Sequence, residues 1–307
     1  MKKLQKKIKQ VNVKEDKTLK ELIDDLDETA FNARRLARAC KIYEKMVKTQ
    51  RCIKFFSLAG AMVPAGMQKI IHDMLDLGFI DVLITTGANI THDVAEILGF
   101  HHLQGDTEQQ DEDLFNKKIS RIYDVYMPTK VYESMEEFIK TLSFEPSISV
   151  KDFLLYLGKE LPDHPHSILK ICSKKRIPIY CPAFTDCGLA MQLSFAFPET
   201  NLNQFKDLKD MINTAWDAKV AGCCIIGGGV PKNYLFQAMQ FSPNSLSYAI
   251  QITMDRPESG GLSGAELREA ISWGKINKSA EFSTVIADAT MVLPILLSYL
   301  KTTCKNR

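Results

Sequence analysis

The sequence predicts one doubly wound, mostly parallel α/β sheet with helices packed ahead of it. Short and nearly continuous apolar runs recur along the chain, and such runs are typical of strands buried on both faces. Segments with helical periodicity separate these runs. Each run ends in a polar or glycine-rich turn, as at the crevice beyond the carboxyl ends of parallel strands. Because no repeat or linker interrupts the pattern, we expect a helical segment at 1–50 followed by one continuous unit at 51–307.

The composition excludes several classes of protein. Of the 307 residues, 45% are hydrophobic and 25% are charged, which is ordinary for a globular protein. The formal net charge of +2 gives no electrostatic case for a nucleic-acid partner, and no apolar run is long enough to span a membrane. The basic run at 1–10 is best interpreted as a solvated tail, with an anionic-surface contact or a targeting arm as alternatives.

The cysteine spacing argues against a metal site. No CxxC pair and no Cys/His set with zinc-finger spacing occurs, so we expect no metal. Free thiols are typical of a reducing compartment, which favours a cytoplasmic location. The eight cysteines are at 40, 52, 172, 181, 187, 223, 224 and 304.

The first half of the chain gives the first strands. Residues 17–50 show helical periodicity, and 53–57 is a short strand candidate. A loop with Gly60, Pro64 and Gly66 leads into a helix that continues to Leu77, where Gly78 is a plausible end. The run at 80–84 predicts a buried strand that ends in Thr85, Thr86 and Gly87. That turn suits a ligand loop, although a plain strand–helix turn is about as good an interpretation.

The middle of the chain contains a polar stretch at 100–130. His101 and His102 are adjacent and would point apart in a strand, so they do not form a metal pair by themselves. We expect a loop with surface histidines there. After a further helix, the apolar run at 177–183 predicts the next strand, which places Asp186 at its carboxyl end.

The last strands repeat this arrangement. The run at 221–226 ends in GGGVPK, where successive glycines allow close approach to a ligand or simply make a tight turn. The runs at 248–253 and 283–290 deliver Thr253 and Asp288 to the same edge. No GxGxxG follows a strand, so the usual dinucleotide fingerprint is absent.

Lys275 is a candidate amine nucleophile between two of these strands. Ser263 and Glu266 have the spacing of a capping box, which predicts a helix starting at Ser263. Glu269 and Trp273 then share a helix face, and Gly274 ends the helix just before Lys275. A buried lysine beside an indole could act as a nucleophile, whereas local pattern alone favours an ordinary surface lysine.

Five segments in order resemble the deoxyhypusine synthase family. They span roughly residues 50–300, and jointly they are highly specific. The segments are DVLITT at 81–86, LGKE at 157–160, IPIYCPAFTD at 177–186, IIGGGVPK at 225–232 and SWGKI at 272–276, with ADA at 287–289 behind them.

This resemblance implies a Rossmann-like, NAD-binding domain and an activity. The family oxidises spermidine to an imine, captures the aminobutyl group on a lysine and passes it to an acceptor amine. That acceptor is a protein lysine in hypusine formation, or putrescine in the related homospermidine synthases. The resemblance also implies a homotetramer with sites at subunit interfaces. It matches Lys275 with the imine-forming lysine, which burial beside Trp273 would help to keep neutral.

The cofactor positions of the family are well kept. The NAD contacts expected from the resemblance and from the strand ends are Thr85, Thr86, Gly87, Asp186, Gly228, Gly229, Thr253, Ser263, Asp288 and Ala289. The polyamine positions are less well kept. Glu269 and Trp273 remain, but Leu262 and Met191 stand where the family has carboxylates. His92 replaces a glutamate, and Asn233 replaces a histidine.

The departures bear on the substrate. Because a buried ammonium needs a paired charge, Leu262 and Met191 would hold the ends of spermidine poorly. His92 could bind a different polar end, act in proton transfer, or lie on the rim. The leading hypothesis is an NAD-dependent aminoalkyl transferase that uses Lys275 and a small-molecule or protein-lysine acceptor. The rival is an NAD-binding protein without catalysis that acts by binding or assembly.

Overall fold

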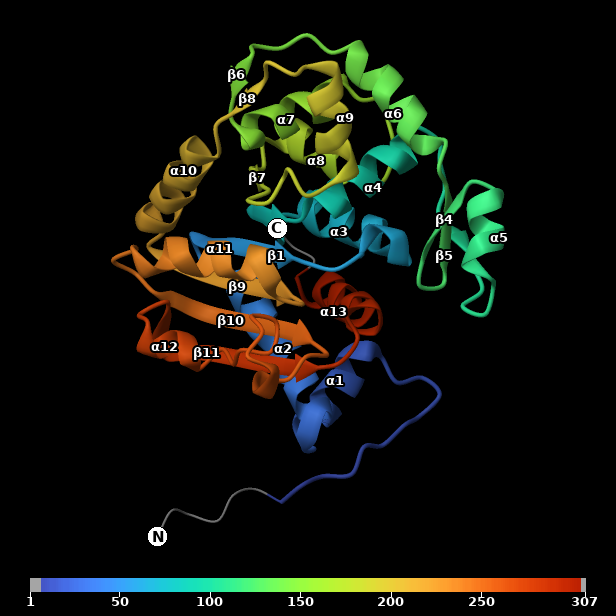
Figure 1. The fold of residues 1–307 in the computed structure, drawn as a ribbon. Coiled ribbons are helices and arrows are strands. Elements are labelled where there is room, and N and C mark those ends of the chain that lie inside the picture. The colour runs from blue at the N-terminus through green and yellow to red at the C-terminus, as the bar shows by residue number, and fades with distance from the viewer. Residues whose placement is uncertain (1–6, 305–307) are drawn as a thin grey trace.

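The structure is a computed structural model that describes residues 7–304. Most of the basic run at 1–10 that sequence predicts to be a tail therefore lies outside the described residues. The described chain forms a central sheet covered by helices on both faces (Figure 1).

The central sheet has six strands, and every neighbouring pair in it is parallel. The predicted doubly wound sheet is thus confirmed. All six strands deliver their carboxyl ends to one edge, which is where the sequence places its polar turns. In spatial order the strands are β11 (Ile276–Ile286), β10 (Leu246–Thr253), β9 (Val220–Ile226), β1 (Cys52–Leu58), β2 (Val82–Thr85) and β7 (Ile179–Tyr180).

Alternate strand residues enter two different cores. Phe55 and Cys223 pack on the face covered by α10, α11 and α12, while Phe56 and Cys224 pack on the face covered by α2, α3 and α13. Successive side chains of a strand point to opposite faces, so a strand buried on both faces needs an unbroken apolar run. This is the reason why the strands read as continuous apolar segments.

Helices connect and cover these strands. The bounds are α1 (Leu19–Asp27), α2 (Phe31–Lys48), α3 (Gln68–Asp76), α4 (Gly87–Ile97), α5 (Asp111–Asn116), α6 (Val131–Lys140), α7 (Val150–Glu160), α8 (Ile168–Lys175), α9 (Gly188–Ala196), α10 (Gln204–Asp217), α11 (Gly229–Gln240), α12 (Glu269–Ser272) and α13 (Ala289–Thr303), with short π and 3₁₀ turns at Val63–Met67 and Pro257–Ser259.

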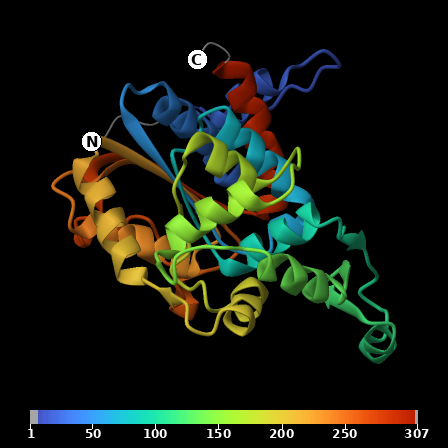
Figure 2. The ribbon, with the colours of Figure 1, turned by 90° about the horizontal axis from the view of Figure 1, so that it is seen from above.

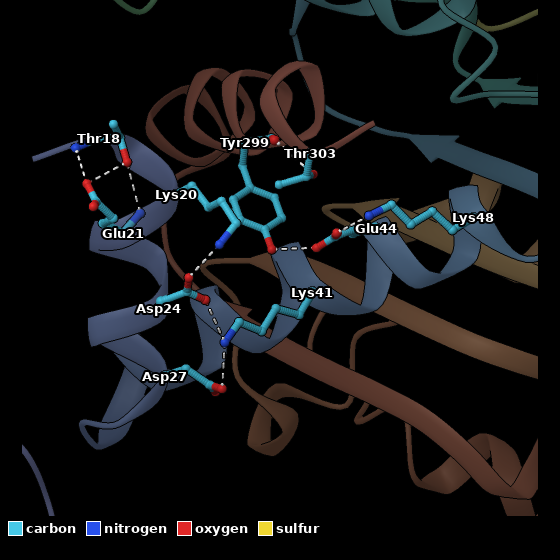
Figure 3. A network of polar contacts seen from close by, with 10 residues as sticks. All are labelled: Thr18, Lys20, Glu21, Asp24, Asp27, Lys41, Glu44, Lys48, Tyr299 and Thr303. Atoms are coloured by element: carbon cyan, nitrogen blue, oxygen red, sulfur yellow. Dashed lines mark hydrogen bonds and ion pairs between the residues drawn. The ribbon is translucent and has the colours of Figure 1, made fainter. Parts of the chain in front are cut away.

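Polar contacts tie the N-terminal helices together and to the C-terminal helix (Figure 3). Lys41 of α2 reaches Asp24 and Asp27 of α1, each at 3.0 Å. The hydroxyl of Tyr299 in α13 donates to Glu44 of α2 at 2.5 Å. These contacts fasten the N-terminal helices to the last helix, beside β10 and β11.

The polar stretch at 100–130 is more structured than the sequence predicts. It forms a three-stranded antiparallel sheet of β3 (Leu103–Gln104), β5 (Val125–Pro128) and β4 (Ile119–Ile122). With α5, it projects from one side of the molecule (Figure 2). The turn between β4 and β5 is Tyr123-Asp124, with Tyr123 at φ 55°, and it lacks the Asn-Gly signal of such hairpins. A second pair, β6 (Ser147–Ile148) with β8 (Asn201–Leu202), was also not predicted.

Candidate functional site

The polar groups that follow the carboxyl ends of the strands lie along one edge of the central sheet. We call this region the strand-end edge. It comprises Thr85–Gly87, Asp186, Gly227–Gly229, Thr253, Ser263 and Asp288. Contacts between neighbouring strand ends join its parts across the whole sheet.

Asn89 joins the ends of β1 and β2. Its amide nitrogen donates to the Gly60 carbonyl at 2.9 Å and to the hydroxyls of Thr85 and Thr86 at 3.3 Å. Its oxygen accepts from the backbone of Met62 at 3.1 Å. Thr85 is buried and donates to the β1 carbonyl of Leu58. Sequence reasoning missed Asn89, although its position three residues after the N-cap Thr86 was a usable signal.

The ends of β2 and β7 pack tightly against each other. A Cβ added to Gly87 would lie 2.7 Å from the Sγ of Cys187, so this position needs a glycine. The hydroxyl of Thr91 in α4 accepts from the backbone of Leu189 in α9 at 3.2 Å. Asp186 lies in the loop between β7 and α9 and is exposed. The carboxylate is therefore available to a ligand at this end of the edge.

The glycine loop after β9 offers backbone groups without side chains. Gly227 and Gly229 have φ values of 67° and 56°, which favour glycine. A Cβ added to Gly228 would meet the Cα of Ser263 at 2.3 Å, whereas one added to Gly229 would meet nothing within 4 Å. The loop also begins α11, a helix of 12 residues. Helix amides and open space suit a phosphate group.

The ends of β10 and β11 complete the edge. The Thr253 hydroxyl accepts from the backbone of Asp255 at 3.1 Å, and the Ser263 hydroxyl donates to the Asp255 carboxylate. Asp288 caps α13 by accepting from the backbone of Thr290 at 2.7 Å, with Ala289 as the first helical residue. Only one carboxylate oxygen of Asp288 is used in these contacts. Asp255 is a further edge residue that sequence reasoning missed.

The helix predicted to start at Ser263 begins later. Only Glu269–Ser272 is helical, so the capping box of Ser263 and Glu266 is wrong. Ser263 instead bonds Asp255, and the Gly228 backbone packs against it. Gly264 has no room for a side chain either, because a Cβ there would lie 2.0 Å from the Arg256 carbonyl oxygen. Tertiary packing of the 255–265 loop thus overrides the local helix signal.

Lys275 is held by its backbone and free at its amine. The backbone of Gly274, at φ 71°, donates to Ile271, and that of Lys275 donates to Ala270. This pair of bonds is a Schellman motif and confirms the predicted stop at Gly274. The residue Lys275 is only 9% exposed, and burial lowers the pKa of its amine. Its Nζ lies 5.1 Å from the centre of the Trp273 ring and bonds no residue in the described range.

Lys232 is a second buried lysine with the opposite arrangement. Its Nζ donates to the carbonyls of Leu262 and Ala265 at 2.9 and 2.7 Å and to Gln251 at 3.1 Å. Burial lowers its pKa to about 8. Three acceptors hold this amine, so its role is to fix the loop that carries Ser263. Sequence reasoning missed it, although a lysine in the helix that directly follows a run of three glycines was a signal.

Lys275 lies far from the strand-end edge of its own chain. It precedes the first residue of β11, whereas Asp288 follows the last. Because β11 pairs with β10 from Leu246 to Thr253, seven steps of about 3.3 Å separate the two ends by roughly 23 Å. One chain therefore does not bring Lys275 to Asp186 or Asp288. Glu269, at the start of α12, is near enough to Lys232 to interact with it electrostatically.

His92, His102 and Glu96 form a hydrogen-bonded chain beside the edge. His102 Nδ1 lies 2.5 Å from Glu96 Oε1, and His102 Nε2 lies 2.9 Å from His92 Nδ1. His101 is exposed, but the His102 side chain is only 6% exposed. The prediction of surface histidines is thus wrong for His102, because Glu96 draws its ring inward.

The remaining substrate positions are dispersed. Trp273, Met191 and Leu262 are 61%, 53% and 44% exposed. Asn233 lies on α11 in a largely apolar groove of about 520 Å³, between α10 and α11.

Two kinds of feature do not occur in the described part of the chain. Between residues 7 and 304, no group of His, Cys, Asp and Glu side chains could hold a metal ion. In the same range, no helix combines the length and apolar character that crossing a bilayer requires.

Comparison with known proteins identifies close relatives. The family model described as deoxyhypusine synthase matches residues 21–300. A protein of Methanosarcina acetivorans named probable deoxyhypusine synthase 1 is 43% identical, over 98% of this chain and 96% of that protein. The protein of the same name from Methanosarcina mazei is 42% identical over the same shares.

Solved structures agree with this fold. A crystal structure of an Entamoeba histolytica protein described as a deoxyhypusine synthase has a TM-score of 0.62 at 18% identity. The match covers 92% of this chain and 93% of that one. At this identity the likeness concerns the fold.

Proposed function

Because the chain belongs to the deoxyhypusine synthase family, we propose that it is an NAD-dependent aminoalkyl transferase that works through Lys275. The enzyme oxidises an amine to an imine, captures an aminobutyl-type group on Lys275, and passes it to an acceptor amine. The single observation that carries this proposal is the state of Lys275. Lys275 is a buried residue whose amine has a lowered pKa and no hydrogen-bonding partner among the described residues.

The chemistry requires such an amine. Imine formation needs the neutral form of lysine, which burial favours by penalising the charged form. The ring of Trp273 shields one side of the amine and can also face a cationic substrate. Lys232 is a poorer nucleophile, because its three acceptors would have to be given up before it could attack.

The strand-end edge fits NAD. The open backbone at Gly229 and the start of α11 would hold the diphosphate, with Gly228 and Ser263 shaping the loop. Asp288 and Asp186 have carboxylate oxygens for ribose hydroxyls, and Thr86, Gly87, Thr253 and Ala289 would complete the contacts. Thr85 would act through Asn89 and Leu58, since it is buried. When bound, NAD supplies the hydride acceptor for amine oxidation.

We further propose that the site is completed between copies of the chain, in a homotetramer. The separation of roughly 23 Å between Lys275 and Asp288 supports this, because the amine of one chain cannot serve the edge of the same chain. The exposed Trp273 beside Lys275 is suitable for such a contact.

The substrate is an amine that carries fewer positive charges than spermidine. This chain keeps fewer of the acidic side chains with which the family binds spermidine. Leu262 and Met191 supply no charge, and His92 replaces a carboxylate, while Glu269 remains for one ammonium. The acceptor is a small polyamine or a protein lysine.

Borohydride trapping tests this proposal. The protein is incubated with NAD and with spermidine, putrescine or agmatine, reduced, and digested for mass spectrometry. We expect an NAD-dependent mass addition on Lys275. Lys275→Ala should lower turnover by at least ~10³-fold while NAD still binds, and Lys278→Ala, an exposed neighbour, should leave both unchanged. If wild-type protein binds NAD but forms no adduct with any amine, the transferase is refuted and the binding or assembly role remains.

A further inference from the structure

The chain of Glu96, His102 and His92 has a fixed order of donors and acceptors. Hydrogen bonds with the two histidines hold the pKa of Glu96 at about 2, despite the opposing effect of burial, so this carboxylate is ionised and only accepts. His102 Nδ1 must then carry the proton of the 2.5 Å contact. The second nitrogen of His102 is left to meet Nδ1 of His92 at 2.9 Å.

With His102 neutral, the rest of the chain follows. Its Nε2 is an acceptor, so His92 Nδ1 donates to it, and His92 Nε2 is left with a free lone pair. That nitrogen makes no hydrogen bond within residues 7–304, and it is not among the fully buried unpaired atoms. The lone pair therefore reaches the surface, on the second turn of α4, the helix that Thr86 caps.

His92 alone is a weak base. Burial is the largest cause that lowers its pKa to about 4, and His102 adds to it. A positive charge is more stable on the ring of His102, which contacts Glu96, than on the ring of His92. If His92 gives its Nδ1 proton to His102, the positive charge comes to rest beside the Glu96 carboxylate.

We propose that His92, His102 and Glu96 are a proton relay that takes the proton released by the amine substrate. This inference rests on the proposed function. The N–H bond of the substrate ammonium breaks and His92 gains a proton at Nε2. At the same time the His92 Nδ1–H bond breaks and a His102 Nε2–H bond forms. The substrate keeps its electron pair as a neutral amine, and the charge ends as the His102 imidazolium paired with Glu96.

Two other groups bear on the charge of this relay. His101 Nδ1 lies 3.1 Å from the second oxygen of Glu96, and His164, in the loop before α8, interacts electrostatically with Glu96. Neither contacts His92 through a hydrogen bond. His101 is therefore a matched control, since it shares Glu96 but cannot pass a proton to His92.

The pH dependence of adduct formation on Lys275 shows whether these three residues transfer a proton or only stabilise the local structure. His92→Phe and His102→Phe keep a ring and remove the path, and we expect the plateau rate to fall at least ~10-fold. Glu96→Gln removes the charge behind His102, so the lower limb of the profile should move to lower pH and the plateau should fall. His101→Gln should keep the wild-type profile. Thermal unfolding of each variant shows whether the fold is retained.

A direct measurement does not depend on turnover. Solid-state NMR of protein labelled with ¹⁵N in its six histidines, assigned with the phenylalanine variants, reports which ring nitrogens carry protons. We expect the spectrum at neutral pH to show His92 protonated at Nδ1 only, because that nitrogen donates to His102 Nε2. A proton on His92 Nε2 in place of Nδ1, or folded His92→Phe protein with the wild-type rate profile, would overturn the relay. If no adduct forms on wild-type Lys275, the proposed function fails by itself, and with it the amine as the source of the proton.

Discussion

The strand-end edge and the corner around Lys275 use their polar groups in opposite ways. At the edge, Asn89 bonds the loop after β1, and Asp255 accepts from Ser263. Gln251 donates to Gly227 and to Ser263. At the corner, only the backbone of Lys275 is bonded, and its amine is left without a partner in the described chain. Internal bonding gives the edge a fixed shape, as a cofactor surface needs. The free amine keeps a reactive group, as a nucleophile needs.

The two buried lysines give the sharpest test of this difference. Lys232→Met leaves two loop carbonyls and Gln251 without their donor, so we expect the free energy of unfolding to fall by about 2–4 kcal/mol. Urea unfolding followed by circular dichroism measures it. Lys209→Met, at an exposed position of α10, should change the same free energy by less than about 0.5 kcal/mol. A Lys232→Met protein that is as stable as wild type would show that this amine braces nothing.

A smaller effect is expected at the glycine loop. In Gly228→Ala the new Cβ would meet the Ser263 Cα at 2.3 Å, so the loop must shift. We expect a loss of about 1–3 kcal/mol in stability and at least a tenfold loss of NAD affinity, measured by calorimetry. Gly261→Ala is the matched control, because its Cβ would make only ordinary contacts at 3.5 Å. Equal NAD binding by both variants would mean that the cofactor does not lie on this loop.

The smallest effect concerns the stability cost of the free amine. Burial lowers the pKa of Lys275, so the folded protein holds this proton less tightly than the unfolded chain does. The charged amine therefore costs stability below the lowered pKa, and the cost vanishes above the ordinary value of 10.5. Lys275→Met should raise the free energy of unfolding at pH 7 by less than about 1 kcal/mol, since the contact with Trp273 is lost as well.

The pH series decides the origin of that gain. Unfolding in urea at pH 7, 9 and 11 should show the difference between variant and wild type shrinking as the pH rises. A gain that stays constant across the series would come from packing of the methionine and would leave the amine without an energetic cost.

The parallel sheet and its edge could be predicted because each depends on local patterns. A strand covered on both faces must be apolar throughout, and its polar turn follows directly in the chain. Thr86, Gly228 and Asp288 were placed on the correct edge for this reason. Contacts between distant segments leave no such pattern. The bond from Ser263 to Asp255 replaced the predicted capping box, and the pairing of His102 with His92 joined residues that sequence reasoning treated separately.

The separation of Lys275 from the edge was beyond local reasoning too. Sequence order places Lys275 just before a strand and Asp288 just after the same strand. The family resemblance, however, assigns both residues to one active site without saying which chain supplies each. Only the register of β11 on β10 turns that order into a distance.

The strand order has a consequence for synthesis of the chain on the ribosome. β1 lies at the centre of the sheet between β9 and β2, and its first residue Cys52 pairs with Val220. At about 5–20 residues per second, the 168 residues from 53 to 220 take roughly 8–34 s to be made. During that time β1 has β2 on one side and an unpaired, apolar edge on the other. A nascent chain stalled before Val220 thus exposes the centre of the future sheet, and it is the species that chaperones must protect.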